Sequence, residues 1–163
     1  MLVLENIKKS YKGQEVLSNA SISVGEKEMV SIMGKSGAGK STLLNIMAGL
    51  IKPDDGRVMF NGNDLTGIDE ESLAAFRLKH IGIVFQDFKL IPSLSVSDNI
   101  LLAIYPRKDI AGSDKKSRVN ELAERVGLKY KLNEKVDNLS GGEKQRVAIA
   151  RSLVNSPVIV LAD

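Results

Sequence analysis

The chain has 163 residues, of which 43% are hydrophobic and 26% charged, and its 23 basic and 20 acidic residues leave a formal net charge of +3. These values are ordinary for one globular domain, so they exclude a disordered or fibrous chain, and the small basic excess gives no reason to expect nucleic-acid binding. The absence of cysteine excludes disulfide bridges and thiolate metal sites.

The hydropathy of the chain argues against insertion in a membrane. No apolar run approaches the roughly 18–20 residues that a membrane-spanning helix needs, and the first residues, MLVLE, lack the pattern of a signal peptide. We therefore expect a cytoplasmic protein, whose role at a membrane, if it has one, depends on a partner.

The first half of the chain alternates between strand and helix patterns. Residues 1–25 read as an antiparallel hairpin with a turn at Lys12-Gly13. The later elements of this half follow in order: a strand over 28–33, a helix over 42–50, a strand over 58–60, a helix over 70–79 and a strand over 81–85. Strands that alternate with helices are typical of an α/β fold with a mostly parallel sheet.

The second half is mainly helical. Between residues 87 and 138 the strand signal disappears, and apolar residues recur at helical spacing in Val119, Leu122, Ala123 and Val126. This stretch is predicted to be a helical insert. A helix then opens at Ser140 and ends near residue 155, and residues 158–162 form an apolar run of strand length.

A phosphate-binding motif lies at residues 34–41, which read GKSGAGKS and fit G-x-x-x-x-G-K-[ST] between a predicted strand and a predicted helix. Glycines let backbone N–H groups turn toward a phosphate at a helix N-terminus, Lys40 supplies a positive charge, and the Ser41 hydroxyl suits Mg²⁺. The alternative is a plain glycine turn. By itself this loop does not separate kinases, GTPases, helicases and transport ATPases.

A second motif, LSGGEKQ at residues 139–145, begins a helix whose first turn contains a capping box between Ser140 and Glu143. Together with the following RVAIAR, this motif resembles the signature of the ABC ATPase family. The resemblance covers the whole chain and implies a P-loop NTPase core with an N-terminal antiparallel β subdomain. It also implies that Ser140, Gly141 and Gly142 bind the γ-phosphate of ATP held by the other member of a head-to-tail dimer.

The same resemblance implies roles for residues outside the two motifs. Tyr11 is expected to stack on adenine, the alternative being an ordinary hairpin tyrosine, and Gln86 and Asp163 match the Q-loop glutamine and the Walker B aspartate. The catalytic group would be Lys40, Gln86 and Asp163, and the Mg²⁺ ligands Ser41, Gln86 and Asp163. The ATP contacts would be Tyr11, Val16, Gly34, Ser36, Gly37, Ala38, Gly39, Lys40, Ser41, Thr42, Ser140, Gly141 and Gly142. The single histidine, His80, fits no family motif and is expected to be structural.

Residues 85–96, FQDFKLIPSLSV, resemble the subgroup that serves lipoprotein release, macrolide export and the cell-division permease complex. That resemblance implies a membrane permease docked near Phe85, Phe88, Leu90 and Pro92, and hence a place on the inner face of the membrane. The alternative is that these side chains belong to the core. A soluble, non-transport ABC ATPase is the competing function, although the stretch before Leu139 is too short for the coiled coil of chromosome-type members.

The resemblance also predicts how the chain is organised and where it falls short of the family pattern. We expect one ABC ATPase domain over 1–163, with a β subdomain and P-loop core at 1–86, a helical insert at 87–138, and the signature helix and Walker B strand at 139–163. Family members continue past the residue equivalent to Asp163 with a catalytic glutamate, a D-loop and a switch histidine. The sequence therefore reads as a C-terminally truncated cassette, and a fragment that binds nucleotide without turnover is an alternative.

Overall fold

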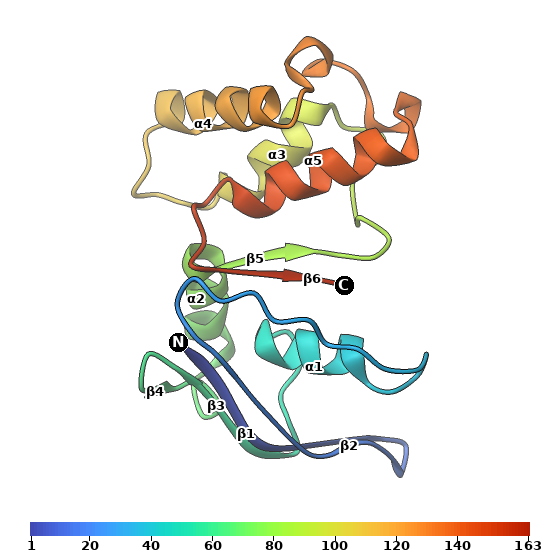
Figure 1. Cartoon of the computed structure of the whole chain (residues 1–163). Helices are drawn as coiled ribbons and strands as arrows, with labels where there is room; N and C mark the ends of the chain where they lie inside the picture. The colour runs from blue at the N-terminus through green and yellow to red at the C-terminus, as the bar shows by residue number, and fades with distance from the viewer. The chain divides into compact units, whose positions relative to one another are not determined.

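Two units make up the computed structural model, which describes all residues from Met1 to Asp163. The first comprises Met1–Ala75 and the second Phe76–Asp163, and the boundary between them falls inside helix α2 (Glu70–His80). Each unit has its own arrangement of helices and strands (Figure 1). The structure confirms the α/β class predicted from the sequence.

An antiparallel sheet forms most of the first unit. Strands β1 (Leu2–Tyr11) and β2 (Gln14–Val24) make the predicted hairpin, and β3 (Asp55–Phe60) and β4 (Asn63–Asp64) complete a sheet of order β2-β1-β3-β4. The two helices of this part of the chain are α1 (Lys40–Met47) and the beginning of α2.

A bulge in β1 decides which side chains this sheet buries. Leu2 and Leu4 are two residues apart and share a buried face, as the twofold period of a strand requires. The register then shifts between Leu4 and Ile7, where Asn6 has a φ of 52°. Because one extra residue reverses the alternation, Ile7 returns to the buried face and is 0% exposed.

The prediction of a strand at residues 28–33 was wrong. The structure contains no strand there, and Met29 and Met33 are 95% and 89% exposed. The carboxylate of Glu28 instead accepts a hydrogen bond from the Gly25 N–H at 2.6 Å, which closes a turn after β2. An apolar run becomes a strand only when a neighbouring strand satisfies its backbone groups, and no segment pairs with this one.

The second unit contains a two-stranded parallel sheet and three full helices. Strand β5 (Ile81–Val84) pairs with β6 (Ile159–Ala162) in a register that places Gly82 opposite Val160. The helices are α3 (Val96–Ile104), α4 (Gly112–Arg125) and α5 (Gly141–Leu153), with short 3₁₀ turns η1 (Lys129–Lys131) and η2 (Val136–Asn138). The helical character expected for the insert is confirmed.

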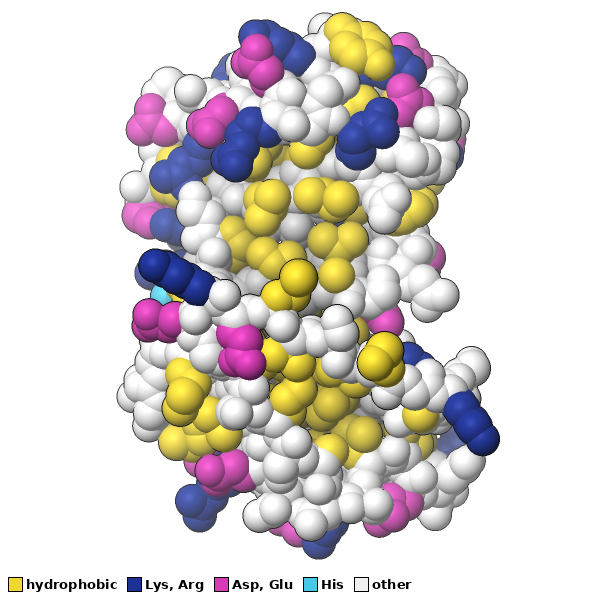
Figure 2. Space-filling model, in the orientation of Figure 1, with side chains coloured by type: hydrophobic (Ala, Val, Ile, Leu, Met, Phe, Trp, Pro, Cys, Tyr) yellow, Lys and Arg dark blue, Asp and Glu magenta, His cyan; other side chains and the backbone are white.

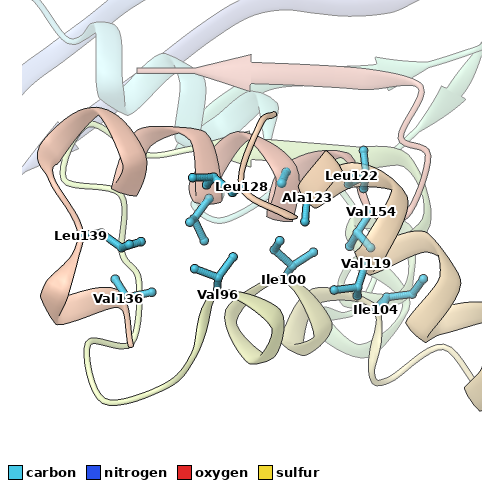
Figure 3. Close-up of a cluster of buried hydrophobic side chains, with 12 residues drawn as sticks. Val96, Ile100, Ile104, Val119, Leu122, Ala123, Leu128, Val136, Leu139 and Val154 are labelled. Atoms are coloured by element: carbon cyan, nitrogen blue, oxygen red, sulfur yellow. The ribbon is translucent and has the colours of Figure 1, made fainter. Parts of the chain in front are cut away.

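The core of the second unit lies among these helices. Twelve buried hydrophobic residues form one cluster, to which α3 contributes Val96, Ile100 and Ile104. Figure 3 shows these side chains and those of Val119, Leu122 and Ala123 on α4 directed toward one another. The helical spacing recognised in the sequence of α4 is therefore the face that it buries.

Strand β6 leaves some of its apolar surface uncovered. It pairs only with β5; Val160 within the strand is 47% exposed, and Val158 just before the strand is 63% exposed. Hydrophobic side chains are visible on the face of this unit along which α5 and β6 run (Figure 2).

None of the five α-helices, whose lengths run from 8 to 14 residues, is long and apolar enough to cross a bilayer.

Candidate functional site

The loop at residues 34–41 adopts a phosphate-cradle geometry in the first unit. Gly37 and Gly39 have positive φ angles of 79° and 83°, which glycine adopts without steric cost. The Lys40 ammonium donates hydrogen bonds to the carbonyl oxygens of Gly34 at 3.0 Å and Lys35 at 2.8 Å. The lysine thus folds back over its own loop, and the loop ends directly in α1.

The beginning of α1 is well suited to an anion. Its N-cap, Gly39, makes no side-chain cap hydrogen bond, and its first turn contains no acidic residue. The first N–H groups of the helix are therefore open to a ligand at the positive end of the helix dipole. A donor set of backbone N–H groups, the Lys40 ammonium and the Ser41 hydroxyl fits a phosphate with its divalent cation.

The hairpin contacts this loop through the segment that follows Tyr11. A Cβ placed on Gly39 would lie 2.9 Å from both the Val16 carbonyl oxygen and Leu17 Cδ2, so Val16 lies directly against the loop. The Tyr11 ring, at the end of β1, is 43% exposed, with the Lys9 ammonium 5.7 Å from its centroid. An exposed aromatic face is what base stacking requires.

The second motif begins α5, and its predicted capping box is confirmed. The Ser140 hydroxyl accepts a hydrogen bond from the Glu143 N–H, and the Glu143 carboxylate accepts from the Ser140 N–H at 2.9 Å and from its hydroxyl at 2.8 Å. Gly141 and Gly142 are exposed, and a Cβ at Gly141 would meet nothing within 4 Å. This helix start therefore carries its own carboxylate beside its exposed N–H groups.

A lysine that sequence reasoning missed neutralises this carboxylate. The Lys131 ammonium on η1 donates to Glu143 Oε1 at 2.6 Å, and the Glu143 side chain is 13% exposed. That hydrogen bond, followed by those from Ser140, lowers the pKa of Glu143 to about 2, and the same contact raises the pKa of Lys131. In the sequence, Lys131 is one of several lysines in the segment before the motif, and nothing in its spacing singles it out as the partner of Glu143.

Gln86 and Asp163 lie at the same edge of the parallel sheet. Gln86 follows β5 in a turn closed by a hydrogen bond from the Phe88 N–H to the Phe85 carbonyl oxygen at 2.9 Å. Asp163 follows β6, and its N–H donates to the Val84 carbonyl oxygen at 3.0 Å. Because the carboxyl ends of parallel strands meet at one edge, the two residues named from the sequence are brought together. The structure contains no group of three or more His, Cys, Asp or Glu side chains that could hold a metal ion.

The residues expected to meet a membrane partner are only partly available at the surface. Phe85 and Phe88 are half-buried and Pro92 is exposed, but Leu90 packs against the hydrophobic cluster of the second unit. For Leu90, the alternative that the side chain belongs to the core is therefore the one that the structure supports.

His80 ends α2 with its ring centroid 4.9 Å from that of Phe76. Burial, followed by the charges of Lys79 and Arg107, lowers the pKa of His80. The ring of His80 thus packs against an aromatic neighbour on its own helix.

The comparisons with known proteins agree on one family. A family model described as ABC transporter matches residues 17–163. The chain is 45% identical over 156 residues to the ABC transporter ATP-binding protein YtrE of Bacillus subtilis, covering 93% of this chain and 67% of that protein. It is 43% identical over 166 residues to the lipoprotein-releasing system ATP-binding protein LolD of Bacteroides fragilis, covering 100% of this chain and 75% of LolD.

Solved structures give the same result for the fold. The ATP-binding cassette MJ0796, in a dimeric post-hydrolysis state bound to ADP and Pi, matches with a TM-score of 0.92 and 41% identity, covering 100% of this chain and 73% of that one. CbiO1 of Clostridium perfringens, part of the transporter complex CbiONQ, matches with a TM-score of 0.85 and 30% identity, covering 99% and 64%. The chain thus spans about two thirds to three quarters of these longer relatives.

Proposed function

The chain belongs to the ABC transporter family of ATP-binding domains, which hydrolyse ATP, and on that premise we propose that it binds MgATP in a head-to-tail dimer and couples hydrolysis to a separate membrane permease. The observation that carries the proposal is the loop at residues 34–41, with Lys40 over its carbonyl oxygens and an uncapped, acid-free helix start. Such a site has donors and positive charge for a polyphosphate and nothing to repel it.

The phosphates and the base are assigned to the first unit. Backbone N–H groups from Gly34 to Thr42 hold the phosphates, the Lys40 ammonium leaves its carbonyl partners for the β- and γ-phosphates, and the adenine stacks on Tyr11 beside Val16. The ammonium exchanges two neutral acceptors for charged ones, which makes each hydrogen bond stronger.

Mg²⁺ is assigned to Ser41, Gln86 and Asp163. Only one of these is a carboxylate, and Mg²⁺ usually completes its octahedron with water and substrate phosphates. The shared sheet edge of Gln86 and Asp163 supports their joint role. When it is bound, the ion neutralises the charge that develops on the transferred phosphoryl group.

The dimer is proposed from the start of α5. Ser140, Gly141 and Gly142 would present N–H groups to the γ-phosphate of the nucleotide held by the second subunit. The ion pair of Glu143 with Lys131 supports this role, because it offsets the one negative charge at this helix start. The dimeric state of MJ0796 with ADP and Pi is a precedent in a relative.

The permease is proposed to dock beside the turn that carries Gln86. Phe85, Phe88 and Pro92 offer half-buried or exposed apolar surface, and Leu90, in the same loop, packs against the hydrophobic cluster of this unit. An amphipathic helix needs apolar anchors of this kind. The chain would then work on the inner face of the membrane, held there by its permease.

The proposal is tested by nucleotide binding and mass. We expect a fluorescent ATP analogue to bind more tightly with Mg²⁺ than with a chelator, and a non-hydrolysable analogue with Mg²⁺ to raise the mass measured by light scattering from monomer to dimer. Absence of nucleotide binding at millimolar concentration would refute the proposal. Binding without a change of mass would remove its dimer part.

A further inference from the structure

Arg151 on α5 contacts the loop that follows β5. Its Nη1 donates to the Lys89 carbonyl oxygen and its Nη2 to the Phe88 carbonyl oxygen, each at 2.6 Å. Burial alone lowers the pKa of Arg151, and no carboxylate pairs with its guanidinium. The charged guanidinium therefore donates to two consecutive backbone carbonyl groups and not to a carboxylate. Such an arrangement fixes the direction of the backbone.

The backbone at these two carbonyl groups is strained. Phe88 and Lys89 have φ angles of 61° and 45°, in the left-handed region that residues with a Cβ seldom adopt. Two charge-assisted hydrogen bonds offset the cost of holding two such residues in succession. The strained pair begins at Phe88, the last residue of the turn closed between Phe85 and Phe88, whose central residues are Gln86 and Asp87.

A second side chain holds the far end of the same loop. Asn99 on α3 is 0% exposed; its Oδ1 accepts from the Ile91 N–H at 2.8 Å and its Nδ2 donates to the Ile91 carbonyl oxygen at 3.0 Å. The loop is therefore attached to α3 at residue 91 and to α5 at residues 88 and 89. Between the end of β5 and the residues that Arg151 contacts, the turn that carries Gln86 has no side-chain anchor of this kind.

We propose that Arg151 is a positioning residue for Gln86: it fixes the turn to α5, so that the turn and the helix that begins with the signature motif move as one body. Gly141 and Arg151 are ten residue steps apart, which is about 15 Å along the helix, so a displacement of the turn is transmitted along α5 to the start of that helix. The role of Gln86 itself rests on the proposed function, whereas the attachment of the loop does not.

Hydrogen exchange of the whole chain tests the attachment. The N–H groups of Phe88 and Lys89 bond to carbonyl oxygens within the turn. In Arg151→Met we expect both to exchange at least about tenfold faster, because two charge-assisted hydrogen bonds are lost. Arg151→Lys keeps the charge but lacks the planar fork, so it should give a smaller increase, and Arg125→Met on α4 is the matched control without change. Unchanged exchange in Arg151→Met would overturn the proposal.

The Mg²⁺ dependence of nucleotide affinity separates positioning from general stabilisation. With Arg151→Lys and Arg151→Met we expect affinity in chelator to equal that of the wild type, while the gain on adding Mg²⁺ falls at least about threefold. A gain that is unchanged in both variants would overturn the positioning of Gln86. A wild type that gains nothing from Mg²⁺ would contradict the proposed function instead, and the exchange rates would still decide the attachment.

Discussion

The two helix starts that the proposed function assigns to phosphate differ in their N-terminal capping. Helix α1 begins at a glycine with no side-chain cap and no acidic residue in its first turn, and the Lys40 ammonium is bonded to carbonyl oxygens of the preceding loop. Helix α5 begins with a complete capping box, and its carboxylate is paired with Lys131. The first start is open to an anion, whereas the second already holds one.

This difference predicts how much each helix start gains when it binds a phosphate. An uncapped helix start gains most when a phosphate arrives, because its N–H groups have no other protein partner. A capped start is stable alone and gains less, since the ligand competes with the carboxylate of Glu143. We therefore expect loss of a phosphate-binding side chain at α1 to act mainly on nucleotide affinity, and loss of a capping side chain at α5 to act mainly on stability.

The largest effect is expected from Lys40→Ala. Removal of the ammonium takes away charge-assisted hydrogen bonds to phosphate, and ATP affinity measured by titration calorimetry should fall about 100-fold. Lys116→Ala, on the exposed face of α4, is the control and should bind as the wild type does. If Lys40→Ala bound ATP normally, the α1 side of the comparison would be wrong.

Gly39→Ala should act on both affinity and stability. A Cβ there requires a left-handed alanine and meets the Val16 carbonyl oxygen and Leu17 at 2.9 Å, so the free energy of unfolding should fall by about 2–3 kcal/mol. Gly13→Ala is a matched control, because its φ of 82° imposes the same strain with nothing within 4 Å. Urea denaturation of both variants isolates the contact; equal losses would show that the fit against Val16 does not matter.

Ser140→Ala should lower stability by less. Loss of an N-cap side chain typically costs about 1 kcal/mol, and for a chain of this size that corresponds to a fall in Tm of about 2–4 °C. Differential scanning calorimetry measures it. Ser140→Asp should restore most of the loss, because a carboxylate also caps; a failure of that rescue would mean that the capping hydrogen bond is not what stabilises α5.

The smallest effect is expected from Lys131→Met. A partly exposed ion pair contributes little, so Tm should fall by about 1–2 °C. The double variant Lys131→Met/Glu143→Gln should recover part of the loss and bind nucleotide at α5 better than Lys131→Met does, because no unpaired carboxylate is left. A double variant no better than the single one would show that Lys131 does not act through Glu143.

The same ion pair gives stability a defined dependence on pH. The pKa of Glu143 is lowered from its ordinary value of 4.5 to about 2 in the folded chain, so the unfolded chain takes up the proton first as the pH falls. Its contribution to stability is present above pH 4.5 and is lost progressively between pH 4.5 and 2. Glu143→Gln should flatten the stability curve in that window, as measured by urea denaturation at several pH values.

Features that depend on neighbouring residues were predictable from the sequence. The capping box needs only Ser140 and Glu143, three positions apart, and the buried face of α4 needs only its own spacing. The glycine loop is equally local. Its sequence predicted the cradle because the φ angles of Gly37 and Gly39 are open to glycine and to few other residues.

Features that depend on distant residues were not predictable. Residues 28–33 have the composition of a strand, but a strand forms only where a partner supplies hydrogen bonds. Lys131 and Arg151 were likewise overlooked as partners of Glu143 and of the loop at Phe88, since the contacts join residues 12 and 63 positions apart. Sequence reasoning found the groups expected to touch the ligand but missed those that hold them in place.

Gly82 on β5 shows how intolerance to substitution can arise without any chemistry. A Cβ at this position would lie 2.3 Å from the Ser152 carbonyl oxygen on α5, so strand and helix touch through bare backbone. Every other amino acid would push apart two segments that the chain brings together from far along its length. In a saturation mutagenesis experiment position 82 should therefore tolerate as few replacements as Lys40, although the proposed function assigns it no ligand, and a stability readout would tell the two kinds of intolerance apart.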